Sequence, residues 1–88
     1  MSIRVLYFGE LREQIGCQQE ELSWSDPLAQ PLTVQDLIDH LASRRTEHAH
    51  ALKNDQPLKV AVNQTMARLS TALPDNAEVA LFRPVTGG

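Results

Sequence analysis

Cysteine is nearly absent from this sequence: Cys17 is the single one among 88 residues, so no internal disulfide can form. Chains without disulfides are typical of reducing compartments, and we expect a cytoplasmic protein. The opening segment has a single basic residue and too short an apolar run for a secretory signal. No segment approaches the roughly 20 apolar residues of a membrane span. These absences predict a soluble protein without a membrane partner.

Glycine is also scarce and occurs only at positions 9, 16, 87 and 88. A phosphate-cradling loop needs closely spaced glycines inside the fold, so we expect this chain not to bind ATP by itself. There is no cysteine pair for zinc. The net charge of −3 argues against nucleic acid, which requires clustered Lys and Arg. We therefore expect no cofactor, no metal and no nucleic acid on this chain.

Two candidate chemical sites each have a simpler alternative. His48 and His50 could bind a metal, but nothing nearby supplies a third and fourth ligand, so solvent-facing side chains near a helix end, His40 included, are favoured. Cys17 could be a nucleophile, but no neighbouring cation or base lowers its pKa. A small residue beside a turn is the favoured interpretation of Cys17.

The pattern of apolar residues predicts one small α+β domain. A length of 88 residues suits a single core. Five strands are expected: an apolar run rich in β-branched and aromatic residues predicts one at 3–8, and others are expected at 18–22, 58–62, 65–69 and 78–82. We expect a short helix at 10–16, a loop at 23–32, and turns at 63–64 and 73–76. The polar stretch 46–54 is ambiguous and could add a short turn of helix.

The main helix is expected to begin after Thr33. Thr33 can cap it, and Asp36 three residues later can complete a capping box. Helical spacing places five apolar residues on one face: Val34, Leu37, Ile38, Leu41 and Ala42. One long helix after two strands, followed by three more strands, predicts a β-grasp (ubiquitin-like) roll, a mixed sheet packed on one main helix. We assign residues 1–82 to this domain and 83–88 to a flexible, extended tail.

The tail carries the strongest chemical signal. Pro84 cannot donate to a β-ladder and should end the sheet, and the six residues beyond Phe82 can extend roughly 20 Å. The last two, Gly87 and Gly88, have no side chains and could thread a narrow channel to bring a carboxylate to another protein's reactive centre. Such a carboxylate reacts after activation as an acyl-adenylate, and a sulfur source can convert it to a thiocarboxylate. The alternative is an ordinary frayed terminus.

The whole chain resembles the family of small, sulfur-carrier subunits of molybdopterin synthase. The resemblance rests on the opening strand with Arg12-Glu13, on Val60 through Thr65, on Asp75 through Phe82, and above all on Pro84-Val85-Thr86-Gly87-Gly88. It departs from the family's usual pattern at three places: Arg83 before Pro84, Asn76 in place of a turn glycine, and a long 23–32 loop containing Trp24. Asn tolerates the positive φ that such a turn requires.

The resemblance implies a function for Gly88. A partner adenylyltransferase would activate it with ATP, and a sulfur-donating enzyme would convert it to a thiocarboxylate. The tail, residues Pro84, Val85, Thr86 and Gly87, would enter the large subunit and donate sulfur to cyclic pyranopterin monophosphate, building the dithiolene of molybdopterin. The implied assembly is a heterotetramer of two large and two small subunits, whose active site lies in the large subunit.

The resemblance also implies an interface at Phe8, Met66 and Phe82, and Arg83 could pair with an acidic partner residue. Phe82 alternates with Leu81, so the two cannot both face the helix, and an outward aromatic near the tail suits an interface. The alternative places Phe8 and Met66 in the core, because strand register is not fixed by sequence. Three other functions stay open: a thiamine-pathway sulfur carrier, a ubiquitin-like protein modifier, and an interaction domain whose tail has no role.

Overall fold

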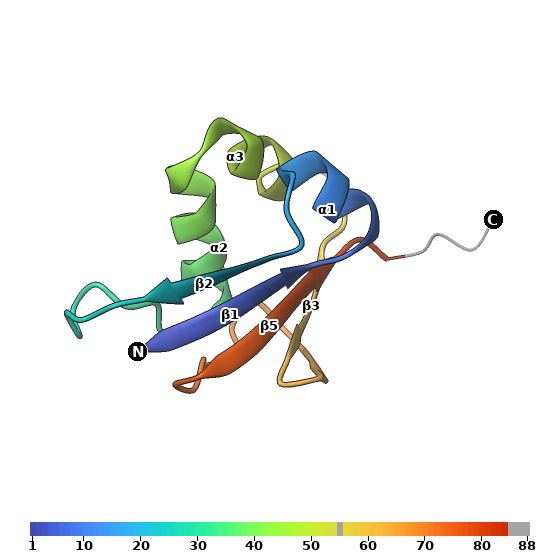
Figure 1. The fold of residues 1–88 in the computed structure, drawn as a ribbon. Coiled ribbons are helices and arrows are strands. Elements are labelled where there is room, and N and C mark those ends of the chain that lie inside the picture. The colour runs from blue at the N-terminus through green and yellow to red at the C-terminus, as the bar shows by residue number, and fades with distance from the viewer. Residues whose placement is uncertain (55, 85–88) are drawn as a thin grey trace.

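The computed structural model of the protein describes residues 1–54 and 56–84. Within them lie a five-stranded sheet, with strand order β2-β1-β5-β3-β4, and three helices on one side of it (Figure 1). The predicted α+β roll, a mixed sheet packed on one main helix, is confirmed. Among the described residues, none of the helices has the length and apolar character needed to cross a membrane.

The centre of the sheet is formed by the two ends of the domain. Strand β1 (Ser2–Tyr7) pairs in parallel with β5 (Ala77–Phe82), and antiparallel with β2 (Gln19–Ser23). Both central strands are expected from their β-branched and aromatic content. Because β1 and β5 are parallel, their carboxyl ends lie side by side at the same end of the sheet, where the tail begins.

The other side of β5 carries a hairpin. Strand β3 (Lys59–Val62) pairs antiparallel with both β5 and β4 (Thr65–Ala67). Strand β4 is two residues shorter than the strand predicted at 65–69. The two turn residues, Asn63 and Gln64, both have positive φ, 50° and 68°. Positive φ at both central residues gives a turn whose twist matches the right-handed twist of the flanking strands. The predicted turn at 63–64 is confirmed.

The main helix α2 (Val34–Arg44) has the predicted capping box. The Asp36 N–H donates to Thr33 Oγ1 at 3.2 Å, and the Thr33 N–H donates to Asp36 Oδ2 at 3.1 Å. Helix α1 (Gly9–Ile15) ends at Gly16, whose φ of 92° is the left-handed conformation typical of a glycine cap. The ambiguous stretch after α2 forms a complete short helix, α3 (Thr46–Leu52).

One apolar core lies between the sheet and the helices. Strand residues alternate between the two faces, and those facing the helices are almost completely buried. These inward residues include Val5 and Tyr7 of β1 and Val79 and Leu81 of β5. Helix α2 contributes Val34, Leu37, Ile38 and Leu41 to the same core, as the helical spacing predicts. The opposite face of the sheet is left uncovered by the helices.

Candidate functional site

The tail begins where β1 and β5 end side by side. Phe82 is the last residue of β5, and the Phe8 N–H, just beyond β1, donates to the Leu81 carbonyl at 3.2 Å. Leu81 is buried against the helices, so alternation turns Phe82 to the opposite face of the sheet. Pro84, two residues on, is the last described residue, and it has no N–H with which to extend the strand.

An apolar row crosses the outer face of the sheet near this end. Strand register aligns four outward residues, one on each of four adjacent strands: Leu6, Ala80, Ala61 and Met66. Phe8 and Phe82 lie two residues beyond Leu6 and Ala80 along the chain, and therefore closer to the tail. Phe8 is 48% exposed and Met66 59% exposed, and Phe82 is half-buried, so the row does not belong to the core. We call these six residues the apolar patch.

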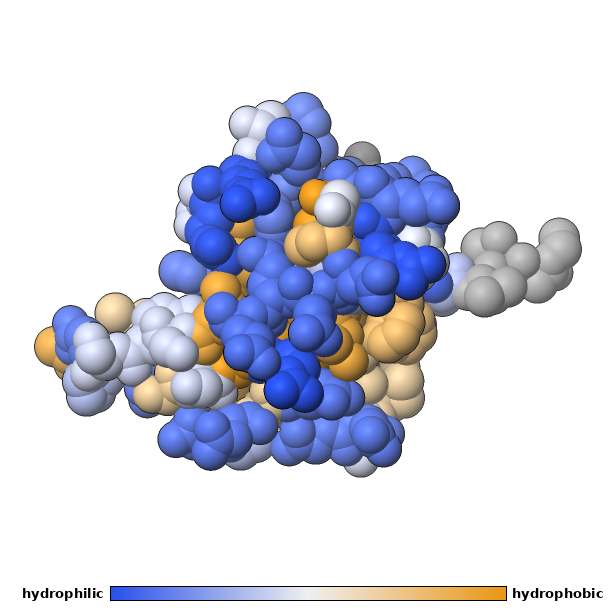
Figure 2. Space-filling model, in the orientation of Figure 1, coloured by the Kyte–Doolittle hydropathy of each residue, from blue (hydrophilic) through white to orange (hydrophobic). Residues whose placement is uncertain are grey.

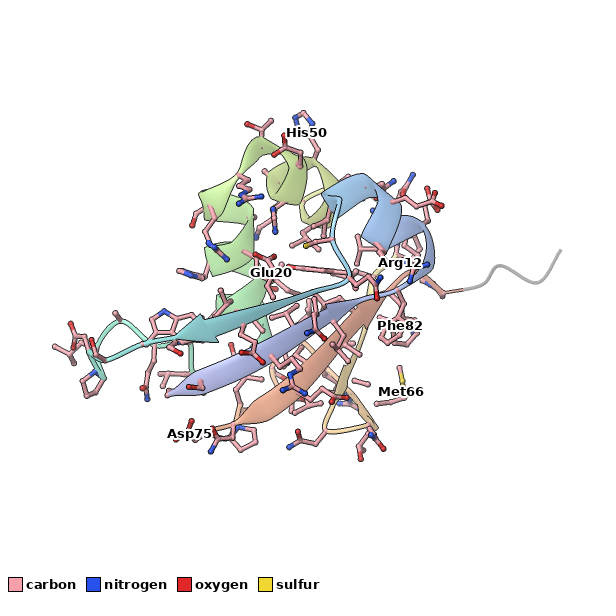
Figure 3. The ribbon with its side chains drawn as sticks, viewed as in Figure 1. Arg12, Glu20, His50, Met66, Asp75 and Phe82 are labelled. Atoms are coloured by element: carbon pink, nitrogen blue, oxygen red, sulfur yellow. The ribbon has the colours of Figure 1, made fainter. Side chains whose placement is uncertain are left out.

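The apolar patch sits beside the start of the tail. Phe8, Phe82 and Pro84 also line a shallow hollow of about 670 Å³, together with Ala80 and the first residues of α1. Figure 2 shows apolar atoms at the right, just below the point where residue 84 ends, and Figure 3 places Met66 and Phe82 together there. Leu28, Leu32 and Leu69 are exposed as well, but they lie in loops outside the sheet.

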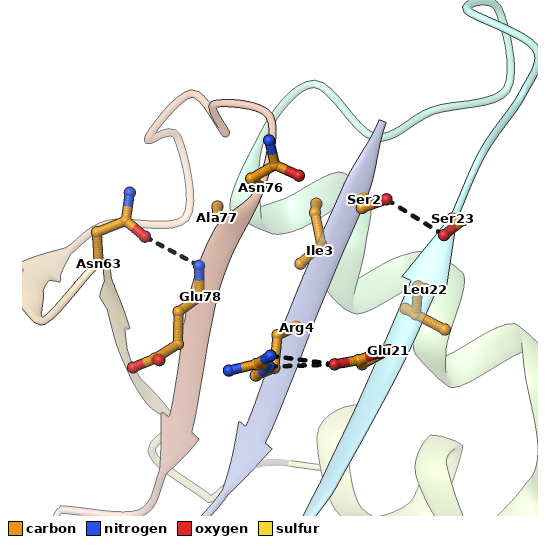
Figure 4. A pocket seen from close by; sticks show the side chains of 10 residues that line it. All are labelled: Ser2, Ile3, Arg4, Glu21, Leu22, Ser23, Asn63, Asn76, Ala77 and Glu78. Carbon is orange, nitrogen blue, oxygen red and sulfur yellow. Dashed lines mark hydrogen bonds and ion pairs between the residues drawn. The ribbon is translucent and has the colours of Figure 1, made fainter.

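The opposite end of the same face is polar (Figure 4). Arg4 donates to Glu21 Oε1 from Nε at 3.3 Å and from Nη2 at 3.1 Å, and the Glu78 N–H donates to Asn63 Oδ1 at 2.9 Å. Asp75 lies at this end of β5, where a hydrogen bond from the Ser2 N–H holds the pKa of its carboxyl below the ordinary value. Along β1 and β5 the outer face therefore changes from polar to apolar, while on β3 the exposed Lys59 stands opposite Phe82 at the apolar end.

Arg83 has a different environment from the patch residues. Its guanidinium Nη2 donates to the Ala51 carbonyl at 2.7 Å and to Gln14 Oε1 at 2.9 Å, and Nη1 donates to the Pro57 carbonyl at 3.3 Å. Every one of these acceptors belongs to its own domain, Gln14 on α1, Ala51 on α3 and Pro57 between α3 and β3. The structure thus brings Phe8, Met66 and Phe82 together on one face, while the guanidinium of Arg83, a residue that also lines the hollow beside Phe8 and Phe82, bonds to its own domain.

A buried polar cluster joins β2 to α3. Glu20 Oε2 accepts hydrogen bonds from Tyr7 Oη at 2.7 Å and from His48 Nε2 at 2.6 Å, and Arg44 Nη1 donates to Glu20 Oε1 at 3.2 Å. Burial of Glu20 opposes its charge, but hydrogen bonds from Tyr7 and His48 and the charge of Arg44 keep its pKa below the ordinary value. Burial and the same hydrogen bond raise the pKa of Tyr7.

His48 is therefore not solvent-facing, and that prediction is wrong: its side chain is 1% exposed. Its position was missed because its partners lie far away in the sequence, on β1 and β2. The spacing of apolar residues does not identify partners so far apart in the sequence. A carboxylate at position 20, on a strand expected to face a helix, is a possible signal of a buried polar partner. Among the described residues, no group of three His, Cys, Asp or Glu side chains could hold a metal ion. Cys17 is partly buried, and burial raises the pKa of its thiol, which disfavours the nucleophilic thiolate.

The remaining predicted site residues, Val85, Thr86, Gly87 and Gly88, lie outside the residues that the structure describes. The described part of the site is consequently an apolar surface and the root of a tail, with no catalytic constellation among residues 1–54 and 56–84 that we can identify. Such an arrangement can bind another protein and present the residues beyond Pro84 to it.

Comparisons with known proteins agree with this geometry. The model of the ThiS family matches residues 5–88. The molybdopterin synthase sulfur carrier subunit of Escherichia coli is 41% identical over 86 residues, covering 98% of this chain and 99% of that protein. The corresponding subunit of Haemophilus influenzae is 38% identical, with the same coverage. The crystal structure of SAMP1 from Haloferax volcanii superimposes with a TM-score of 0.79 and 26% identity, covering both chains completely.

Proposed function

Because the chain belongs to the ThiS family, we propose that it is a sulfur carrier, specifically the sulfur-carrier subunit of a molybdopterin synthase. The observation that carries this proposal is the apolar patch beside the root of a tail that matches the family through its last residue, Gly88. A surface for another protein and a thin segment next to it are what a carrier needs, since it must be held by one partner after another. No catalytic group within the chain is required.

The proposed chemistry takes place at the Gly88 carboxylate. Attack of this carboxylate on the α-phosphorus of ATP releases pyrophosphate and gives an acyl-adenylate. Free sulfide delivered by a donor enzyme then attacks the acyl carbon, and the C–O bond to AMP breaks, which leaves a thiocarboxylate and releases AMP and a proton. The thiocarboxylate sulfur attacks an electrophilic carbon of cyclic pyranopterin monophosphate, and as the C–S bond forms, that carbon loses an oxygen leaving group. Water finally cleaves the acyl–sulfur bond, so the sulfur stays on the pterin and the carboxylate returns.

Each part of the chain has a role in this scheme. Phe8, Met66 and Phe82 would contact the large subunit and the adenylyltransferase in turn, because one apolar surface can serve two partners at different times. The tail from Pro84 to Gly87 would carry Gly88 into the partner's active site, where glycine at position 87 allows close approach. ATP would be bound by the adenylyltransferase alone. We place the assembly, two large and two small subunits, in the cytoplasm.

A second function shares the same activation step. SAMP1 is named a small archaeal modifier protein, and its fold is similar to that of this chain. An adenylated Gly88 attacked by a lysine amine would give an isopeptide bond in place of a thiocarboxylate. A thiamine-pathway carrier would use the thiocarboxylate on another acceptor. The fold suits all three, and the identity to molybdopterin synthase subunits over nearly the whole chain favours the first.

Deletion of Gly88 in the organism of origin tests the proposal. The shortened protein should fold normally, because the sheet and the apolar core are built from residues that precede Pro84, but molybdoenzyme activity should be lost. A matched Arg45→Ala strain, altered at an exposed residue between α2 and α3, should keep the activity. Retained molybdoenzyme activity without Gly88 would refute the carrier role in this pathway. Ladders of heavier conjugates that vanish with Gly88 would favour the modifier instead.

A further inference from the structure

The residue that precedes Pro84 is tied to its own domain at three points. Arg83 donates to the carbonyls of Ala51 and Pro57 and to the side-chain oxygen of Gln14, at 2.7, 3.3 and 2.9 Å respectively. Ala51 lies in the last turn of α3, whose carbonyls lack partners within the helix. A cation is favourable at such a helix end, so the guanidinium meets an acceptor suited to it.

The third acceptor is itself held in place. Gln14 Nε2 donates to Glu10 Oε1 at 3.2 Å, one turn earlier on α1, and this bond leaves Gln14 Oε1 free to accept from Arg83. Glu10 lines the hollow beside Phe8 and Phe82. A continuous set of hydrogen bonds therefore links Glu10 and Gln14 on α1 to Arg83, and both Glu10 and Arg83 line the hollow.

We propose that Arg83 is a positioning residue that fixes where, and in which direction, the tail leaves the domain. This inference rests on the proposed function, in which Gly88 must reach a partner's active site. Arg83 is held by acceptors on α1, on α3 and before β3, while Phe82, its neighbour in the chain, turns toward the outer face of the sheet. Proline at 84 then restricts the next backbone angle.

Positioning by Arg83 should reduce the range of directions that Gly88 must sample before it meets a partner's active site. Without the three hydrogen bonds, Arg83 can reorient and the direction in which the chain leaves the domain varies, whereas with them that direction is fixed at Arg83. Correct orientation of a reacting group adds to the rate. Arg83 should thus affect how often a docked carrier reacts, and the apolar patch should affect how tightly it docks.

This role differs from a direct ion pair between Arg83 and an acidic residue of the partner. A guanidinium that already donates to three acceptors of its own domain must give them up to reach a partner's carboxylate. The two roles also respond differently to Gln14. Removing the Gln14 side chain weakens the positioning of Arg83, but it leaves a partner ion pair unaffected or makes it easier to form.

The experiment compares four variants in ATP-dependent adenylation by the adenylyltransferase of the same organism. Arg83→Ala should lower kcat about fivefold with KM changed less than twofold, because docking is intact and presentation is not. Gln14→Ala should lower kcat about twofold, and Arg83→Lys should fall between the two, since lysine keeps the charge but loses the planar fork. Arg45→Ala removes the same charge elsewhere and should match the wild type.

Two results would overturn the proposal. A raised KM for Arg83→Ala, with Gln14→Ala unchanged, would assign Arg83 to a partner contact. A lowered melting temperature with unchanged kcat, measured where every variant is folded, would leave Arg83 a purely structural role.

A measurement without any partner separates this proposal from the function on which it rests. The Arg83 Nε–H is buried, so its NMR order parameter should be near that of a rigid backbone and should fall in Gln14→Ala. If the wild type is never adenylated, the sulfur-carrier function fails regardless of Arg83. If the order parameter is instead below about 0.6 in the wild type, the positioning role fails even in an active carrier.

Discussion

The two ends of the outer sheet face share the same strands but differ in chemistry. Near the tail, the face presents Phe8, Met66 and Phe82, whereas at the far end it presents the Arg4–Glu21 pair and Glu78. Alternation along a strand explains why both sets point outward, but it does not explain why one end is apolar. Among the described residues, exposed apolar side chains line up across strands beside the tail root, and exposed apolar patches of this kind are typical of binding surfaces.

The largest expected effect comes from placing a charge in the apolar patch. Met66→Asp should weaken binding to the large subunit about 100-fold, near 3 kcal/mol, because an uncompensated carboxylate would be buried in the interface. The same change should alter the melting temperature little, since Met66 is more than half exposed in the isolated domain. Isothermal titration calorimetry and thermal denaturation provide the two measurements.

The matched control lies at the polar end of the same face. Glu78→Ala, on the same strand as Phe82, should leave the dissociation constant within about twofold. Comparable losses of affinity from Met66→Asp and Glu78→Ala would mean that the partner covers the entire face, and the distinction between its two ends would have no functional meaning.

The next effect compares adjacent carboxylates on opposite faces of β2. Glu20 accepts from Tyr7, His48 and Arg44, while Glu21 pairs only with exposed Arg4 among the described residues. Glu20→Gln should lower the free energy of unfolding by about 2 kcal/mol, because buried donors lose their charged acceptor. Glu21→Gln should cost less than about 0.5 kcal/mol, as exposed pairs do. Urea denaturation at neutral pH would contradict this account if the two losses were equal.

A smaller effect arises from the titration of Glu20. Its pKa is lower in the folded protein than its ordinary value of 4.5, so the folded state favours the charged form. The resulting stability is fully present above that ordinary value and is lost as pH falls through the lower, folded pKa. The wild type should thus lose more stability below about pH 4.5 than Glu20→Gln does. Parallel acid profiles of the two proteins would show that Glu20 carries no such contribution.

Local patterns in the sequence predict most of the fold. Thr33 and Asp36 identify the start of α2, and the hairpin turn at Asn63 and Gln64 separates β3 from β4. The outward position of Phe82 is also predicted by its alternation with Leu81. These features depend on residues a few positions apart, where periodicity and capping chemistry are informative.

The features that escaped prediction depend on distant partners. The buried ring of His48 bonds to Glu20 and packs edge-on against Tyr7. Both partners belong to strands that lie much earlier in the sequence. Arg83 takes acceptors that lie 32 and 69 residues away, on α3 and α1. No local pattern specifies such contacts, and the expected pairing of Arg83 with an acidic partner residue stays a prediction. The helical state of 46–52 likewise depends on packing against α1 and α2.

The most direct test of the central claim is the intact mass of the protein after incubation with its adenylyltransferase, ATP and a sulfur-donating enzyme. Exchange of one carboxylate oxygen for sulfur should add about 16 mass units, located by fragmentation at Gly88 and absent when ATP is omitted. An unchanged mass in a mixture that consumes ATP, or an added mass at any residue other than Gly88, would contradict a sulfur carrier that works through its last residue.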